Sequence, residues 1–210
     1  MFFQKKEKLN INTLRSAFDA QKKILIEKGY LKMHGITLES FNDTLESLWK
    51  VLLEKNEHLE IKIFGDIPLL LVPQQCGLPD RIKMINGHTE LNITEIEESQ
   101  QSELNPFYLV LDVEDGRKMV AKSAKDSLNK FKKENRSALN INESLALLTY
   151  YPEILKNHYL ITAGTFYKKD GENLPLLWLL DEDHNPELHY AWFDIAHGSY
   201  GAGSYAIKII

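Results

Sequence analysis

The sequence predicts an α+β fold, in which an N-terminal helical pair precedes a mainly antiparallel sheet with helices packed on it. Two observations carry this prediction. Apolar residues recur at helical spacing over the first part of the chain, whereas short strand-like runs joined by short turns follow one another from residue 158 onward. Closely spaced strands without intervening helices favour antiparallel pairing over βαβ units.

The helical pair is expected at residues 10–28 and 38–55. Gly29 ends the first helix, and Thr37 is the expected N-cap of the second. Because the link between them is short and contains glycine, we expect a helical hairpin. The apolar residues that keep helical spacing include Leu14, Phe18, Leu45, Leu48, Trp49 and Leu52.

Three strand-like runs follow the helical pair. Residues 59–64 and 67–72 could form a hairpin, in which Pro68 either places the second run at an edge of the sheet or delays its start, because proline lacks a backbone donor. Residues 107–113 form a third run, which Glu114-Asp115-Gly116 ends. These runs predict the first strands of the sheet.

A polar, acidic stretch at residues 93–106 is typical of a loop or a linker. We expect one α+β domain over residues 1–210. The alternative is a division at this stretch, into a helical and hairpin part (1–92) and a sheet and helix part (107–210).

The second half of the chain adds helices and four more strands. Residues 117–136 hold eight Lys or Arg against two acidic residues, and their second half has the apolar spacing of an amphipathic helix. Asn140 and Glu143 have the spacing of a capping box, which begins a further helix. The predicted strands are 158–162, 175–180, 188–193 and 205–209.

Composition limits the classes of protein. The chain has 210 residues, 43% hydrophobic and 26% charged, with a net charge of -5, which is ordinary for a globular protein and makes nucleic acid an unlikely partner. Cys76 is the only cysteine, so we expect a reducing, cytoplasmic location. The charged N-terminus and the short apolar runs predict neither a signal peptide nor a membrane span.

The C-terminal segment from Ala191 to Tyr205 is the most informative part of the chain, because it gathers aromatic, glycine, serine and histidine residues. We interpret it as the contact surface of a non-enzymatic binding or protein-interaction domain. Its partner is a protein or a small molecule that the sequence does not identify. The expected binding residues are Trp192, His197, Tyr200, Gly201, Ser204 and Tyr205.

The alternative function is a small-molecule hydrolase or transferase that uses His197 and Asp194, with Ser199 as a third candidate catalytic residue. These residue types supply a base, an orienting carboxylate and a nucleophile. No nucleophile elbow, phosphate loop or Zn-binding His-Glu motif supports a named reaction, so whether the chain is an enzyme stays open. We expect no cofactor and no metal site, because the acidic residues beside His184 and His189 are typical of a solvated turn.

Several ordered segments resemble a bacterial family known only as a domain of unknown function. The most specific is Leu147-Leu148-Thr149-Tyr150-Tyr151-Pro152-Glu153, and the terminal segment with Trp192 and His197 is similar as well. The resemblance implies relatedness and a common fold, and it implies no reaction. The other similar segments are 65–68, 108–116, 140–146 and 176–179.

Overall fold

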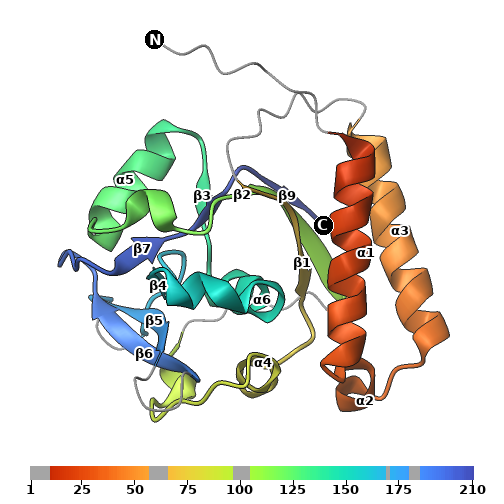
Figure 1. Cartoon of the computed structure of the whole chain (residues 1–210), viewed down its shortest axis with the longest axis horizontal. Coiled ribbons are helices and arrows are strands. Elements are labelled where there is room, and N and C mark those ends of the chain that lie inside the picture. The colour runs from red at the N-terminus through yellow and green to blue at the C-terminus, as the bar shows by residue number, and fades with distance from the viewer. Residues whose placement is uncertain (1–9, 57–65, 97–104, 169–170, 180–184) are drawn as a thin grey trace.

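The fold is α+β, as the sequence predicts, with strands in mostly antiparallel sheets (Figure 1). The computed structural model describes residues 10–56, 66–96, 105–168, 171–179 and 185–210. Figure 1 shows the helical pair on one side of a central sheet and a second sheet with its own helix on the other side.

Helices α1 (Ile11–Glu27) and α3 (Leu38–Asn56) form the predicted hairpin. Asn10 caps α1 by accepting a hydrogen bond from the Asn12 backbone N–H at 2.9 Å. Gly29 ends the helix with a φ of 80°, and a short helix α2 (Tyr30–His34), which the sequence did not predict, fills the link. Phe18 and Trp49 pack their rings between α1 and α3, with centroids 5.2 Å apart.

The central sheet has the order β1-β2-β9 and is antiparallel throughout. Its strands are β1 (Ile67–Pro73), β2 (Phe107–Val113) and β9 (Ile207–Ile209). Within the described ranges β1 is an outer strand, in agreement with the position of Pro68. The predicted strand at 59–64 lies outside the described residues, and the described partner of β1 is β2.

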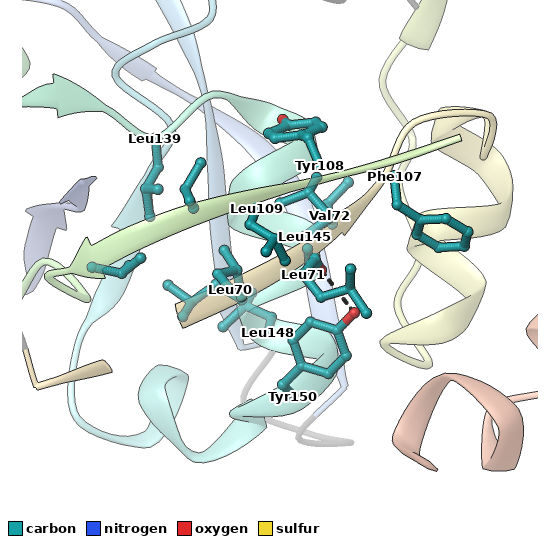
Figure 2. Close-up of a cluster of buried hydrophobic side chains, with 14 of the residues drawn as sticks. Leu70, Leu71, Val72, Phe107, Tyr108, Leu109, Leu139, Leu145, Leu148 and Tyr150 are labelled. Carbon is teal, nitrogen blue, oxygen red and sulfur yellow. Dashed lines mark hydrogen bonds between the residues drawn. The ribbon is translucent and has the colours of Figure 1, made fainter. Parts of the chain in front are cut away.

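The main core lies between β1, β2 and helix α6 (Ile141–Tyr150), which is buried along its whole length (Figure 2). Asn140 and Glu143 form the predicted capping box, each side chain bonding the other residue's backbone N–H at 2.9 Å. The Tyr150 hydroxyl donates to the Leu71 carbonyl at 2.8 Å, and this bond ties α6 to β1.

The second sheet has the order β6-β5-β4-β7. Its strands are β4 (Tyr159–Ile161), β5 (Asn173–Leu179), β6 (Pro186–Trp192) and β7 (Tyr200–Ala202). The last predicted strand, 205–209, does not join this sheet. It divides between β8 (Ser204–Tyr205) and β9, because the apolar β2 takes β9 as its second neighbour. The fourth strand of this sheet is β7, which lies next to β4 and runs parallel to it.

Helix α5 (Ala124–Lys133) confirms the predicted amphipathic basic helix and packs on the second sheet. Ala124, Ser127 and Phe131 are its buried residues. A 3-10 turn, η2 (Arg117–Met119), precedes it, and β3 (Ser137–Ala138) follows it and pairs with β8.

The remaining elements are short. Helix α4 (Leu78–Met84) follows β1, η1 (Ile93–Glu95) begins the polar stretch, and η3 (Pro152–Lys156) follows α6. Residues 97–104 of the polar stretch lie outside the described residues. None of the helices in the described ranges is both long enough and apolar enough to cross a bilayer.

Candidate functional site

The C-terminal segment crosses the second sheet from one edge to the other. Strand β6 ends at Trp192 and β7 begins at Tyr200, so residues 193–199 connect two outer strands of the β6-β5-β4-β7 order. A turn before β7 is fixed by the Tyr200 N–H, which donates to the His197 carbonyl at 3.1 Å. The Ser199 carbonyl accepts from the Tyr159 N–H at 2.8 Å, which holds the turn against β4.

This path creates a continuous series of aromatic rings, which we call the aromatic row. Successive ring centroids lie between 4.1 and 6.4 Å apart, and the series draws on every strand of the second sheet. The strand register explains most of it: Tyr159 pairs with Tyr200, and Leu160 pairs with Leu177, which brings Tyr159 beside Trp178. In spatial order the row is His197, Tyr200, Tyr159, Trp178, His189, Tyr190 and Trp192.

Exposure along the row is uneven. Trp192 and Tyr190 are 48% and 41% exposed, and His197 is exposed at the other end, while the rings between them are half-buried. Partial burial raises the pKa of Tyr200 above its ordinary value, so the phenol is neutral at physiological pH. The Trp178 indole N–H donates to the Glu187 carboxylate at 2.7 Å, which fixes the orientation of the central ring. The row therefore follows one face of the sheet from Tyr200 to His189 and continues around β6 to Tyr190 and Trp192 on the other face, and both of its ends are accessible to solvent.

The candidate catalytic residues lie in the same segment, but the structure does not gather them into a site. Asp194, His197 and Ser199 are all exposed. Between these three described residues the one hydrogen bond runs from the Ser199 backbone N–H to His197 Nδ1, at 3.3 Å. Neither Asp194 nor the Ser199 hydroxyl is placed to assist the imidazole as a triad would require.

Two of the expected binding residues, Gly201 and Ser204, are buried, and a third, Tyr205, is half-buried. Gly201 is buried, and a Cβ there would lie 2.3 Å from the Gly116 carbonyl oxygen, so the residue is required by a close approach of two backbones. Tyr205 is half-buried, and burial together with the nearby Glu143 carboxylate raises its pKa to about 12.

Ser204 is fully buried in a polar network below the sheet. Its hydroxyl accepts a hydrogen bond from Arg136 Nε at 2.8 Å. Arg136 in turn pairs with the buried Asp112 carboxylate at 2.6 Å, and Asp112 holds a φ of 57°. This network joins β2, β3 and β8, which is a structural role.

A cleft of about 930 Å³ borders the row near Tyr159. Its walls include Ile85, Pro152, Lys156, His158, Tyr159 and Ser199. His158 is buried, and its Nε2 lies 3.0 Å from the Asp115 carbonyl oxygen. Its Nδ1 is also buried and makes no hydrogen bond to any described residue. The cleft thus has a histidine in its wall that the sequence did not single out.

Metal binding finds no support in the parts of the chain that the structure describes, where no group of three or more His, Cys, Asp or Glu residues could hold an ion. His184 and the acidic residues beside it lie outside the described ranges. His189 belongs to the aromatic row, where it packs on Trp178 with ring centroids 4.9 Å apart.

Sequence reasoning anticipated Trp192, His197 and Tyr200 and missed the other four rings of the row, which are Tyr159, Trp178, His189 and Tyr190. The missed residues lie in three different strands, so only the pairing register brings the rings together. One signal was present: Trp178 and His189 lie in two predicted strands joined by a short turn, which is the arrangement that creates cross-strand contacts.

Comparison with known proteins places the chain in a family. The model of a family of unknown function, DUF5701, matches residues 24–209. The match covers nearly the whole chain, and the protein therefore belongs to this family. No curated protein and no solved structure matched the chain significantly.

Proposed function

We propose that the protein is a non-enzymatic binding protein and that the aromatic row is its contact surface. The observation that carries the proposal is the unbroken series of seven rings across all four strands of the second sheet. Aromatic side chains are enriched at interfaces, because they offer large contact area at a small cost in conformational entropy. The row supports a role in recognition more directly than any group of catalytic residues on this chain.

A purely structural role for the rings is the competing explanation, since cross-strand aromatic pairs stabilise sheets. The exposure of the row favours recognition. Tyr190 and Trp192 leave nearly half of their surface in water, so they add little to the core. A ring that is exposed at this level on an ordered strand is available to a partner without any rearrangement of the sheet.

Nuclear magnetic resonance tests the proposal directly. We would add planar aromatic compounds and short peptides to the 15N-labelled protein and follow the backbone amide signals. Shifts concentrated on residues 159, 178, 189, 192 and 200, and lost in Tyr200→Leu, would support it. If no probe at millimolar concentration perturbs the row, or if shifts are confined to the cleft beside η3, the proposal is wrong.

A paired stability measurement separates recognition from structure. We expect Trp192→Thr to leave the free energy of unfolding nearly unchanged, because threonine suits a strand and the indole is 48% exposed. The matched control is Leu53→Thr on α3, which also replaces a side chain that is 39% exposed. A much larger loss for Trp192→Thr than for the control would favour the structural explanation.

The cellular location and the domain organisation of the protein are also proposals. We place it in the bacterial cytoplasm, because its single cysteine, the buried Cys76, allows no disulfide within the chain. We also propose one domain, supported by the larger hydrophobic cluster, which takes residues from both sides of the 93–106 stretch. Limited proteolysis at that stretch, followed by a test of whether the fragments separate, would examine the second point.

A further inference from the structure

Four rings of the aromatic row share a face of the second sheet with the most basic segment of the chain: Tyr200, Tyr159, Trp178 and His189. Tyr190 and Trp192 alternate with His189 and Ala191 along β6 and lie on the other face. Helix α5 packs on the first of these faces over Ile161, Leu176 and Ala202, while Tyr159, Trp178 and Tyr200 pack against the edge of the same small core. The helix and the rings are therefore neighbours on one surface, although they are far apart in the sequence. Figure 1 shows α5 directly beside β7.

Backbone hydrogen bonds fix this neighbourhood. The Ala121 N–H donates to the Tyr200 carbonyl at 3.1 Å, and the Lys125 N–H donates to the Phe193 carbonyl at 3.0 Å. The segment that carries Lys122 and Lys125 is thus bonded to both ends of the 193–200 connection. Aromatic and basic side chains that do not alternate in the sequence are placed side by side by the fold.

The lysines of this segment are available to a ligand. Residues 117–136 hold eight basic residues, and four of them are exposed lysines that form no ion pair with the rest of the described chain. The net charge of -5 conceals this separation, because the remainder of the chain is acidic. The four lysines are Lys122, Lys125, Lys132 and Lys133.

We infer that this face binds single-stranded nucleic acid, with bases on Tyr159, Trp178 and Tyr200 and phosphates on the lysines of the α5 segment. The inference deepens the proposed function and rests on it. Proteins that bind single strands combine rings that stack on bases with a positive surface that follows the backbone. Complementary charge favours this occupant over a neutral peptide, and the rings favour it over a simple polyanion. It departs from the expectation drawn from net charge, because the local charge, not the total, acts on a bound phosphate.

The experiment measures fluorescence anisotropy of labelled single strands of about 15 nucleotides, DNA and RNA, at several salt concentrations. Lys122→Gln with Lys125→Gln should weaken binding and lower the slope of log K against log salt by about 1.4, since each lost phosphate contact removes about 0.7. The matched control is Lys28→Gln with Lys50→Gln, which removes the same charge from exposed positions in the helical hairpin. The control should leave the slope unchanged.

The rings give a second, independent readout. Tyr159→Leu or Tyr200→Leu keeps the apolar packing and removes the stacking face, so each should weaken binding by between about 5-fold and 150-fold without changing the salt slope. Asp194→Asn removes an exposed carboxylate beside the row and should strengthen binding. A melting temperature close to that of the wild type shows that a variant is folded.

Several outcomes would overturn the inference. They are no binding of single strands at low salt, equal weakening by the control lysine pair, and affinity that is unaffected by both tyrosine changes. Equal binding of polyglutamate would show that the basic segment recognises acidic proteins instead. Because small planar probes test the row separately, shifts on the row without oligonucleotide binding would refute this inference alone and leave the proposed function standing.

Discussion

Replacing Gly201 by alanine tests whether the glycines of the C-terminal segment serve the fold or a ligand. A Cβ at this position would lie 2.3 Å from the Gly116 carbonyl oxygen and 3.0 Å from its carbon. Both atoms belong to the backbone, so no side-chain rotation can relieve the contact. Overpacking of a core costs about 1–3 kcal/mol, and a rigid backbone neighbour places this substitution near about 3 kcal/mol.

The matched control is Gly198→Ala, three residues earlier in the same segment. A Cβ there would meet no atom within 4 Å, and Gly198 does not have a positive φ. We therefore expect no loss of stability, and a gain of up to about 1 kcal/mol through the less flexible unfolded chain.

Thermal unfolding followed by circular dichroism measures the difference. For a chain of this size, about 3 kcal/mol corresponds to a decrease in melting temperature of roughly 6–12 °C. If Gly201→Ala melts within about 2 °C of the wild type, the close approach of β7 to Gly116 is not a packing constraint and the reasoning fails. The same loss in both variants would also refute it, because the two positions differ only in their surroundings.

Three further predictions concern charge and exposure. Ser204→Ala leaves the buried Arg136 Nε without its acceptor and should cost about 1–3 kcal/mol in urea unfolding, whereas unchanged stability would contradict the assigned network. Burial alone would raise the pKa of Asp115. The hydrogen bonds and the charge of Arg117 outweigh this effect and lower the pKa below the ordinary value of 3.8. Its stabilising contribution is complete above that value and is lost as pH falls through the lower folded pKa, so Asp115→Asn should be about 1–2 kcal/mol less stable at neutral pH and equal to the wild type in strong acid. His197→Ala removes an exposed ring and should change stability by under about 0.5 kcal/mol, a value that a melting curve would check.

The sequence predicted best those features that depend on neighbouring residues. Thr37 and Asn140 were identified as caps because a cap requires only a side-chain acceptor a few residues before its donor. Gly29 was identified as a helix end for the same local reason. Such features survive almost any tertiary arrangement, and they fix the type and bounds of the elements.

The pairing of strands could not be predicted in the same way. Strand β7 lies parallel to β4, and β9 pairs with β2, which precedes it by about a hundred residues. Nothing in residues 205–209 distinguishes a neighbour in one sheet from a neighbour in the other, because both sheets offer apolar strands. The positive φ of Asp112 could not be predicted either, since its ion pair with Arg136 joins residues that are 24 positions apart in the sequence.

The candidate site was predicted only in part, because it too depends on how strands pair and how helices pack. Composition indicated the segment with Trp192, His197 and Tyr200, and their role in binding stays a prediction. The rings of Tyr159 and Trp178 join them only through register, and the lysines of α5 only through packing. A surface assembled from five elements has no signature in any one stretch of sequence.

Gln21 covers two backbone bonding positions of strand β1. Its side-chain amide donates to the Leu69 carbonyl and accepts from the Leu71 N–H, both at 2.7 Å, which is how a peptide group of an adjacent strand would bind. One helical residue thereby occupies the bonding positions through which outer strands of separate molecules could pair. An open strand of such apolar sequence is a template for aggregation. We expect the amide of Gln21 to hinder pairing between the β1 strands of two molecules, so Gln21→Ala should increase aggregation on refolding more than it lowers the melting temperature.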